Sequence, residues 1–121
     1  NIINWVKQSL ESGNSIKVVT DQWRTPTFVD DLVKGILLII EKKATGIFHI
    51  SGSDGLSPYD MAIKTARYFK LPEEMIEKVD SSNFRQPGQR PLKTGFKIDK
   101  AKKELGYEPL SFDESLRRMF G

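Results

Sequence analysis

Arg24 is the first residue of this chain whose type and position suggest chemistry. It lies two residues before Pro26, whose ring fixes φ and pushes Thr25 towards an extended conformation. A planar guanidinium that is always charged, and that is held on such a stiffened turn, can bind a phosphate through parallel hydrogen bonds. An isolated arginine on a loop is more often an ordinary surface residue, and the local residues alone favour that interpretation.

A second group of cations lies in the segment 84–96, where two prolines and two glycines predict a loop. Arg85 and Arg90 are five residues apart, and Lys93 follows them. Two guanidinium groups on a stiffened loop match a diphosphate better than lysines on a mobile tail do. A nucleic-acid groove is the competing interpretation, but few aromatic residues lie among these cations and no nucleic-acid fold motif is present.

The other candidate motifs do not form a complete catalytic site. The segment 52–55, Gly-Ser-Asp-Gly, lies between a predicted strand and a predicted helix, but it lacks the third glycine of the dinucleotide fingerprint. We therefore favour a structural turn there. His49 is the only histidine and cannot build a metal site alone, so we expect it to be packed within a strand. No tyrosine is followed by a lysine four residues later, and no Ser/His/Asp arrangement suggests a hydrolase.

The hydrophobic pattern predicts an α/β fold with a few short strands and about five helices. Helices are expected near 2–12, 28–45, 58–70, 99–105 and 112–120, and strands at 16–19, 47–51 and 76–79. Ser57 with Asp60 and Ser111 with Glu114 have the spacing of helix-capping boxes. So small a sheet is incomplete, and we expect its strands to pair best with strands from elsewhere.

The helix that follows Arg24 is the longest apolar helix of the sequence. Thr27 is the expected N-cap, and Asp30 and Asp31 lie in the first turn, where carboxylates suit the helix dipole. Apolar residues recur at helical spacing and predict a largely buried helix that ends at Gly46. These residues are Val29, Leu32, Val33, Ile36, Leu37 and Ile40.

The composition fits one globular domain, or one lobe of a larger protein, of 121 residues. The absence of cysteine excludes disulfides and thiol catalysis. No apolar run is long enough to span a membrane and no signal peptide is visible, so we expect a cytoplasmic protein without a membrane partner. Because the sequence starts with Asn rather than Met, we expect it to be a fragment.

The net charge of +3 is unevenly distributed. Seven cations and one acidic residue lie between Arg85 and Lys103. Such an excess invites an anionic partner, which could be a nucleic acid, a nucleotide or a sugar phosphate. For the lysines at 100, 102 and 103 a solvated helix face is the favoured interpretation.

Several segments carry a family resemblance when they are taken together in this order and spacing. They are Asn-Ile-Ile at 1–3, Arg-Thr-Pro-Thr-Phe-Val-Asp-Asp-Leu-Val at 24–33, Gly-Ile-Phe-His-Ile-Ser-Gly at 46–52, Tyr-Asp-Met-Ala at 59–62, Arg-Pro-Leu at 90–92 and Asp-Lys-Ala-Lys-Lys-Glu-Leu-Gly-Tyr-Glu-Pro at 99–109. Nearly the whole chain resembles the C-terminal, substrate-binding part of extended short-chain dehydrogenases/reductases. The type most similar is the dTDP-4-dehydrorhamnose reductases, together with the non-catalytic methionine adenosyltransferase regulatory subunit of the same form.

The resemblance implies that residues 1–121 are a sugar-nucleotide-binding domain without its N-terminal Rossmann domain. In such enzymes that missing domain carries the NADP loop and the catalytic Ser/Thr, Tyr and Lys. The resemblance therefore implies NADP(H) in the parent enzyme, none bound by this fragment alone, and a dTDP-sugar as partner. Pairing with a second copy is a further expectation, because an isolated lobe with open sheet edges can pair with itself.

The resemblance also implies roles for particular residues. Asn1 matches an asparagine near the nucleotide diphosphate, and the segment from Lys17 to Val19 matches a strand whose backbone lies beside the base. Arg24 matches an arginine on the diphosphate, so the resemblance favours function for it. Either Arg85 or Arg90 matches a second such arginine, and Arg90 fits the Arg-Pro pattern better.

Alternatives to a reductase remain open at this point. A regulatory protein without catalysis, or a sugar-nucleotide epimerase or dehydratase, would share the same form. A basic nucleic-acid-binding domain is the alternative from another class. Both the identity of the sugar and the choice between NADP and NAD stay open from the sequence.

Overall fold

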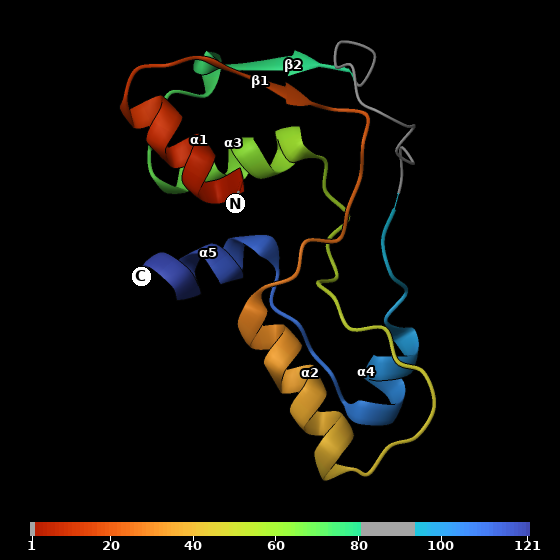
Figure 1. Cartoon of the computed structure of the whole chain (residues 1–121). Coiled ribbons are helices and arrows are strands. Elements are labelled where there is room, and N and C mark those ends of the chain that lie inside the picture. Colours follow the sequence, from red (N-terminus) through yellow and green to blue (C-terminus); the bar gives the residue numbers. More distant parts are fainter. Residues whose placement is uncertain (1, 81–93) are drawn as a thin grey trace. The chain divides into compact units, whose positions relative to one another are not determined.

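A computed structural model of the chain describes residues 2–80 and 94–121. Within these residues it contains five α-helices, one 3-10 helix and two parallel strands (Figure 1), which confirms the predicted α/β class. The chain divides into two units. The first unit comprises 1–24 and 56–94, and the second comprises 25–55 and 95–121.

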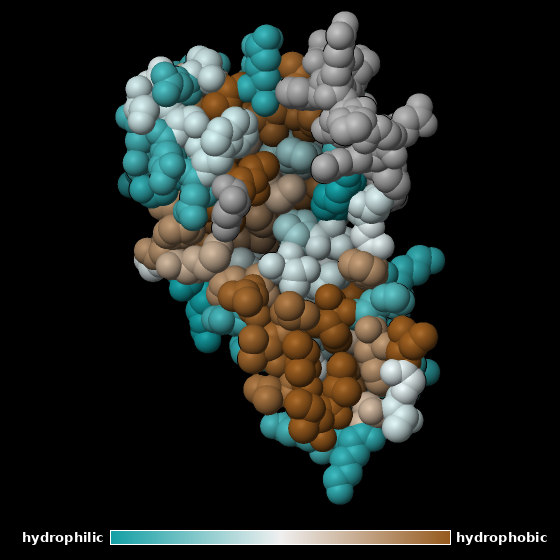
Figure 2. All heavy atoms as spheres, in the orientation of Figure 1, coloured by the Kyte–Doolittle hydropathy of each residue, from teal (hydrophilic) through white to brown (hydrophobic). Residues whose placement is uncertain are grey.

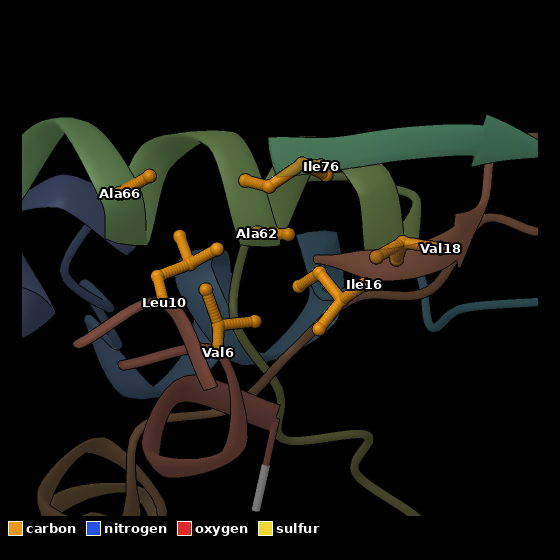
Figure 3. Packing of buried hydrophobic residues seen from close by; sticks show 7 residues of the cluster. All are labelled: Val6, Leu10, Ile16, Val18, Ala62, Ala66 and Ile76. Carbon is orange, nitrogen blue, oxygen red and sulfur yellow. The ribbon is translucent and has the colours of Figure 1, made fainter. Parts of the chain in front are cut away.

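The first unit is built around a pair of parallel strands. Both strands expected at 16–19 and 76–79 are present, but they pair with each other, whereas we expected partners from elsewhere. β1 (Ile16–Val19) pairs with β2 (Ile76–Val79) in the register Ile16↔Ile76 to Val19↔Val79. Two helices, α1 (Ile2–Glu11) and α3 (Pro58–Tyr68), pack against each other and against β1, and the short 3-10 helix η1 (Glu73–Met75) leads into β2. Figure 3 shows the core that these elements share: Val6, Leu10, Ile16, Val18, Ala62, Ala66 and Ile76.

The second unit holds the remaining helices: α2 (Val29–Glu41), α4 (Asp99–Leu105) and α5 (Phe112–Phe120). Its core consists of Ile98, Ala101, Leu105 and Tyr107 with apolar side chains of α2 and of the segment 44–50. The hydroxyl of Tyr107 donates a hydrogen bond of 2.8 Å to the Ser51 carbonyl. Burial, together with the nearby Asp31 carboxylate, raises the pKa of Tyr107 to about 12.

Both predicted capping boxes are present and fix the starts of two helices. In each, the serine hydroxyl accepts from the backbone N–H three residues later, and the acidic side chain there accepts from the serine N–H. The bonds to the Ser111 backbone and hydroxyl lower the pKa of Glu114. Gly106, at φ 70°, ends α4 in the left-handed conformation that glycine adopts without strain.

The prediction that α2 is largely buried is wrong. Six apolar residues of this helix are exposed by 38–65% in the structure. We call them the α2 apolar face: Val29, Leu32, Val33, Ile36, Leu37 and Ile40. The opposite side of the helix is the buried one, where Asp31 and Gly35 lie. The apolar periodicity therefore identified a face that is suited to burial, but the described residues do not bury it.

The strand predicted at 47–51 is also absent, and His49 is not packed within a strand. The segment has neither helical nor strand structure, and no described strand pairs with it. His49 is exposed and stacks on the ring of Phe96, with centroids 5.2 Å apart. A β-rich sequence becomes a strand only when a partner supplies the ladder of hydrogen bonds.

The ends of α2 differ slightly from the prediction. Phe28 rather than Thr27 is the N-cap, and the Thr27 hydroxyl instead accepts a 3.3 Å hydrogen bond from the Gly52 N–H. At the other end α2 stops at Glu41, before Gly46, because the chain reverses at Lys43 with φ 49°.

Candidate functional site

The carboxyl ends of the two parallel strands form the edge of the candidate site. β1 and β2 end in register at Val19 and Val79, and the following Thr20 stays attached to β2. Its backbone N–H donates to the Val79 carbonyl at 2.9 Å, and its hydroxyl donates to the same oxygen at 3.3 Å. Ligands of parallel α/β sheets bind outside the carboxyl ends of the strands, so this edge is where a site is expected.

Arg24 lies four residues after Thr20, and both its backbone N–H and its backbone carbonyl are hydrogen-bonded to Leu56. Its N–H donates to the Leu56 carbonyl at 2.9 Å, and the Leu56 N–H donates back at 2.8 Å, which makes an isolated antiparallel bridge. The guanidinium donates from Nη1 to the Trp23 carbonyl at 2.9 Å and from Nη2 to Oε1 of the buried Gln22 at 3.4 Å. The cation is therefore positioned by its own turn rather than left on a free tether, which suits recognition of a fixed anion.

Described residues near both ends of the segment 81–93 are hydrogen-bonded to the stretch that precedes Arg24. Residues 81–93, which include Arg85 and Arg90, lie outside the described residues. Before them, β2 ends at Val79, which Thr20 contacts; after them, the Thr94 N–H donates to the Trp23 carbonyl at 2.9 Å. The Trp23 carbonyl thus accepts from both Thr94 and the Arg24 guanidinium.

The structure places three of the predicted site residues in one continuous stretch of the first unit. Lys17 and Val19 lie on β1, with an exposed Lys17 side chain opposite Glu77 and a half-buried Val19 opposite Val79. Arg24 follows at the end of the connecting turn. The other predicted site residues are outside the described residues: Asn1, Arg85 and Arg90.

Sequence reasoning missed the residues that orient Arg24. Gln22 gave no signal because a glutamine beside an exposed turn is usually solvated, whereas here it is 9% exposed. Trp23 and Thr94 act through a backbone carbonyl and a backbone N–H, and no side-chain motif reports such contacts. Trp23, the residue before the arginine, is 40% exposed.

The segment 52–55 has a structural role, as favoured from its sequence. Gly52 packs so closely on the Pro26 carbonyl that a Cβ would clash with that oxygen. The Asp54 carboxylate accepts a 2.8 Å hydrogen bond from the Phe112 N–H and so holds the start of α5. These contacts do not fit a loop that cradles the pyrophosphate of a dinucleotide, which needs backbone N–H groups pointing at the ligand.

The described residues contain neither a cluster of metal ligands nor a membrane-spanning helix. No group of three or more His, Asp or Glu side chains in 2–80 and 94–121 is arranged to hold a metal ion. None of the helices described there has the length and apolar character needed to cross a bilayer.

Comparison with known protein families decides the relationship of this chain. A family model described as the RmlD substrate binding domain matches residues 1–121. The chain belongs to this family. The match covers both units, and with them the Arg24 turn and the segment 81–93.

Relatives of this RmlD substrate-binding domain include enzymes and solved structures. It is 26% identical to a dTDP-4-dehydrorhamnose reductase of Sinorhizobium fredii over 96% of this chain and 44% of the relative. It is 30% identical to a dTDP-4-keto-6-deoxy-D-glucose reductase of Streptomyces niveus over 79% of this chain and 33% of the relative. A crystal structure of dTDP-4-dehydrorhamnose reductase from Bacillus anthracis in complex with NADP superposes with a TM-score of 0.86 at 26% identity, covering 99% of this chain and 42% of that one. The chain therefore spans less than half the length of these relatives.

Proposed function

We propose that this RmlD substrate-binding domain is the sugar-nucleotide-binding part of an NADPH-dependent reductase of the dTDP-4-dehydrorhamnose type. The observation that carries the proposal is the Arg24 guanidinium, which is hydrogen-bonded to Trp23 and Gln22 in the turn that follows β1. Val79 and Thr94, which lie on either side of the segment bearing Arg85 and Arg90, are hydrogen-bonded to Thr20 and Trp23 of the stretch before Arg24. The names of the two reductase relatives support a dTDP-linked keto sugar as substrate. We also propose that the parent enzyme is cytoplasmic.

Each proposed contact follows from the chemistry of its residue. Arg24 binds the diphosphate, and a second arginine, Arg90 in preference to Arg85, binds it from the neighbouring segment. The β1 backbone from Lys17 to Val19 lies beside the base, and Asn1 lies near the diphosphate. In this account the chain binds and orients the sugar nucleotide and contributes no proton-transfer group.

The proposal assigns the cofactor to the rest of the parent polypeptide. The segment 52–55 does not fit a dinucleotide, because Gly52 and Asp54 are engaged within their own unit. NADPH bound elsewhere in the parent would supply the hydride for reduction of the keto sugar at C4. The part played by this chain is to hold the substrate by its diphosphate while that transfer takes place.

Calorimetric titration of the parent enzyme with dTDP tests the two arginines. We expect Arg24→Ala and Arg90→Ala each to weaken dTDP binding about 10- to 150-fold, because each removes a charged hydrogen bond of about 1.5–3 kcal/mol. Arg85→Ala, tested in parallel, shows which arginine of the 81–93 segment contacts the diphosphate.

Arg67→Gln is the matched control, since it also removes one positive charge from the first unit. Arg67 lies near the end of α3, where it forms an exposed ion pair with Glu73, roughly 14 Å along the helix from its start. We expect its dTDP affinity to equal that of the wild type. Unchanged affinity in Arg24→Ala would refute the assignment, whereas intact affinity without NADPH oxidation in the wild type would indicate a non-catalytic member of the family.

A further inference from the structure

The turn between β1 and Arg24 contains one buried polar side chain, Gln22. In Figure 2 the exposed hydrophobic side chains gather over α2, in the second unit. The turn at 20–24 belongs to the first unit and reads Thr-Asp-Gln-Trp-Arg, so a ligand bound there meets mainly polar and charged groups. Gln22 is 9% exposed, whereas Asp21 is partly exposed and Trp23 is exposed. Burial of an amide costs free energy unless a hydrogen bond compensates for it, so the partner of Gln22 indicates its role.

The Gln22 side chain contacts Arg24 through its amide oxygen. Arg24 Nη2 donates to Gln22 Oε1 at 3.4 Å, and Nη1 of the same guanidinium donates to the Trp23 carbonyl at 2.9 Å. Because arginine has donors and no acceptor, the amide must turn its oxygen, and not its NH2 group, towards it. Each terminal nitrogen of the guanidinium therefore has its own acceptor, and two acceptors define the plane of the group, which one bond alone would leave free to rotate.

The backbone is anchored on either side of Gln22. The Thr20 N–H donates to the Val79 carbonyl, and Arg24 exchanges two backbone hydrogen bonds with Leu56. Only three residues, 21–23, lie between these anchored positions. The fold of the first unit therefore determines where the Gln22 oxygen lies, so the amide is a fixed acceptor to which the arginine side chain is bound.

The Gln22 amide oxygen and the Trp23 carbonyl oxygen are both uncharged, and this matters for an anionic ligand. A carboxylate at position 22 would bind the guanidinium more strongly, but it would also neutralise the positive charge. Its own negative charge, shielded from water, would repel a diphosphate bound nearby. An amide oxygen orients the guanidinium and leaves the full charge in place. Glutamine therefore orients the arginine without competing with an anion for it.

We propose that Gln22 is a positioning residue of the anion site: its buried, uncharged Oε1 orients Arg24 and leaves the whole positive charge of the guanidinium to the diphosphate. The inference rests on the proposed function, because it takes Arg24 to be a residue that binds the diphosphate. It adds that the affinity for an anion depends on the uncharged amide at position 22 and not on the arginine alone. Gln22 acts through Arg24 in this account and contacts no phosphate itself.

Calorimetric titration of the parent enzyme with dTDP and with thymidine tests the proposal. Gln22→Glu keeps the size of the side chain and replaces the amide by a carboxylate. At neutral pH we expect this variant to bind dTDP about tenfold or more weakly and to bind thymidine within about twofold of the wild type, since thymidine carries no phosphate. Gln8→Glu is the matched control, because it makes the same change at an exposed position of α1. It should bind both ligands as the wild type does.

A second variant tests the orienting bond and keeps the proposal falsifiable if a buried carboxylate prevents folding. Gln22→Met has nearly the same length and lacks the amide oxygen. It should weaken dTDP binding about 3- to 10-fold in the otherwise unaltered parent. In the Arg24→Ala background it should have no further effect, because the amide acts only through the arginine. A purely structural role would instead lower the affinity for dTDP and thymidine alike, and equally in both backgrounds.

The outcomes distinguish this inference from the proposed function. If Arg24→Ala leaves dTDP binding unchanged, the diphosphate assignment of Arg24 fails and the inference fails with it. If Arg24→Ala weakens dTDP binding but Gln22→Glu binds dTDP as well as Gln8→Glu does, or more tightly, the inference alone is overturned. An equal loss from Gln22→Met in both backgrounds would also overturn it, since Gln22 would then support the fold and not the guanidinium.

Discussion

Each unit contains a helix with an apolar face, but that face is buried in the first unit and exposed in the second. In the first unit, Val6 and Leu10 of α1 are 0% and 3% exposed, because α3 and the strand pair cover them. In the second unit, the α2 apolar face has equally regular spacing and remains open. The contrast teaches that apolar periodicity identifies a face suited to burial but does not predict whether the described residues bury it.

The largest expected effect comes from equal truncations in the two helices. Leu10→Ala in this chain should lower the free energy of unfolding by about 2–5 kcal/mol, because it leaves a cavity in a closed core. Leu37→Ala removes the same atoms from a side chain on the exposed α2 apolar face. It should change the free energy of unfolding by about 0.5 kcal/mol or less. Denaturant unfolding measures both.

The parent polypeptide sharpens this comparison. If the α2 apolar face is buried there, Leu37→Ala should become destabilising by about 2 kcal/mol or more, as in a core. A Leu37→Ala effect that stays near zero in the parent would show that the α2 apolar face is exposed there too. A large effect in this chain alone would contradict the exposure of Leu37.

Leu38 and Ile39, on the inner side of α2, pack against a core that contains Tyr107. The titration of Tyr107 tests whether this core is closed. The pKa of Tyr107 is raised from 10.0 to about 12, so the unfolded chain loses this proton at a lower pH than the folded chain. The contribution is fully present below pH 10 and is lost as the pH rises towards 12; its size is about 2–3 kcal/mol.

Tyr107→Phe is the control for this pH dependence, since it keeps the ring and removes the titrating group. The stability difference between wild type and Tyr107→Phe should therefore shrink between pH 10 and 12. Parallel pH profiles of the two proteins would show that the hydroxyl is not buried as described.

A smaller effect on the free energy of unfolding is expected from the Asp31 carboxylate on the buried side of α2. Asp31 is 1% exposed, and its Oδ2 accepts a 3.0 Å hydrogen bond from the Leu110 N–H. Asp31→Ala leaves that N–H without its acceptor and should cost about 1–3 kcal/mol of unfolding free energy. Asp30→Ala, in the same helical turn but exposed, should cost about 0.3–1 kcal/mol through the helix dipole alone. Equal costs in thermal or denaturant unfolding would mean that the Asp31 bond contributes nothing.

Local chemistry made part of this structure predictable. The capping boxes at Ser57 and Ser111 and the end of α4 before Gly106 each depend on residues within a few positions of one another. Such features follow from backbone geometry and hydrogen bonding that the neighbouring residues determine. The local residues alone favoured an ordinary surface arginine at Arg24; only the family resemblance favoured a role at the diphosphate, and that role stays a prediction.

The features that could not be predicted depend on distant groups. The Trp23 carbonyl accepts from Thr94, which is 71 residues away, and the Asp31 carboxylate accepts from Leu110, which is 79 residues away. The segment 47–51 failed as a predicted strand for the same reason, because strand structure needs a pairing partner that local sequence does not specify.

The most direct test of the account compares dTDP with thymidine as ligands of the parent enzyme, before and after Arg24→Ala. If Arg24 grips the diphosphate, the substitution should weaken dTDP binding about 10- to 150-fold and leave thymidine binding unchanged, since thymidine has no phosphate for it to contact. An equal loss for both ligands, or no loss for dTDP, would contradict the account.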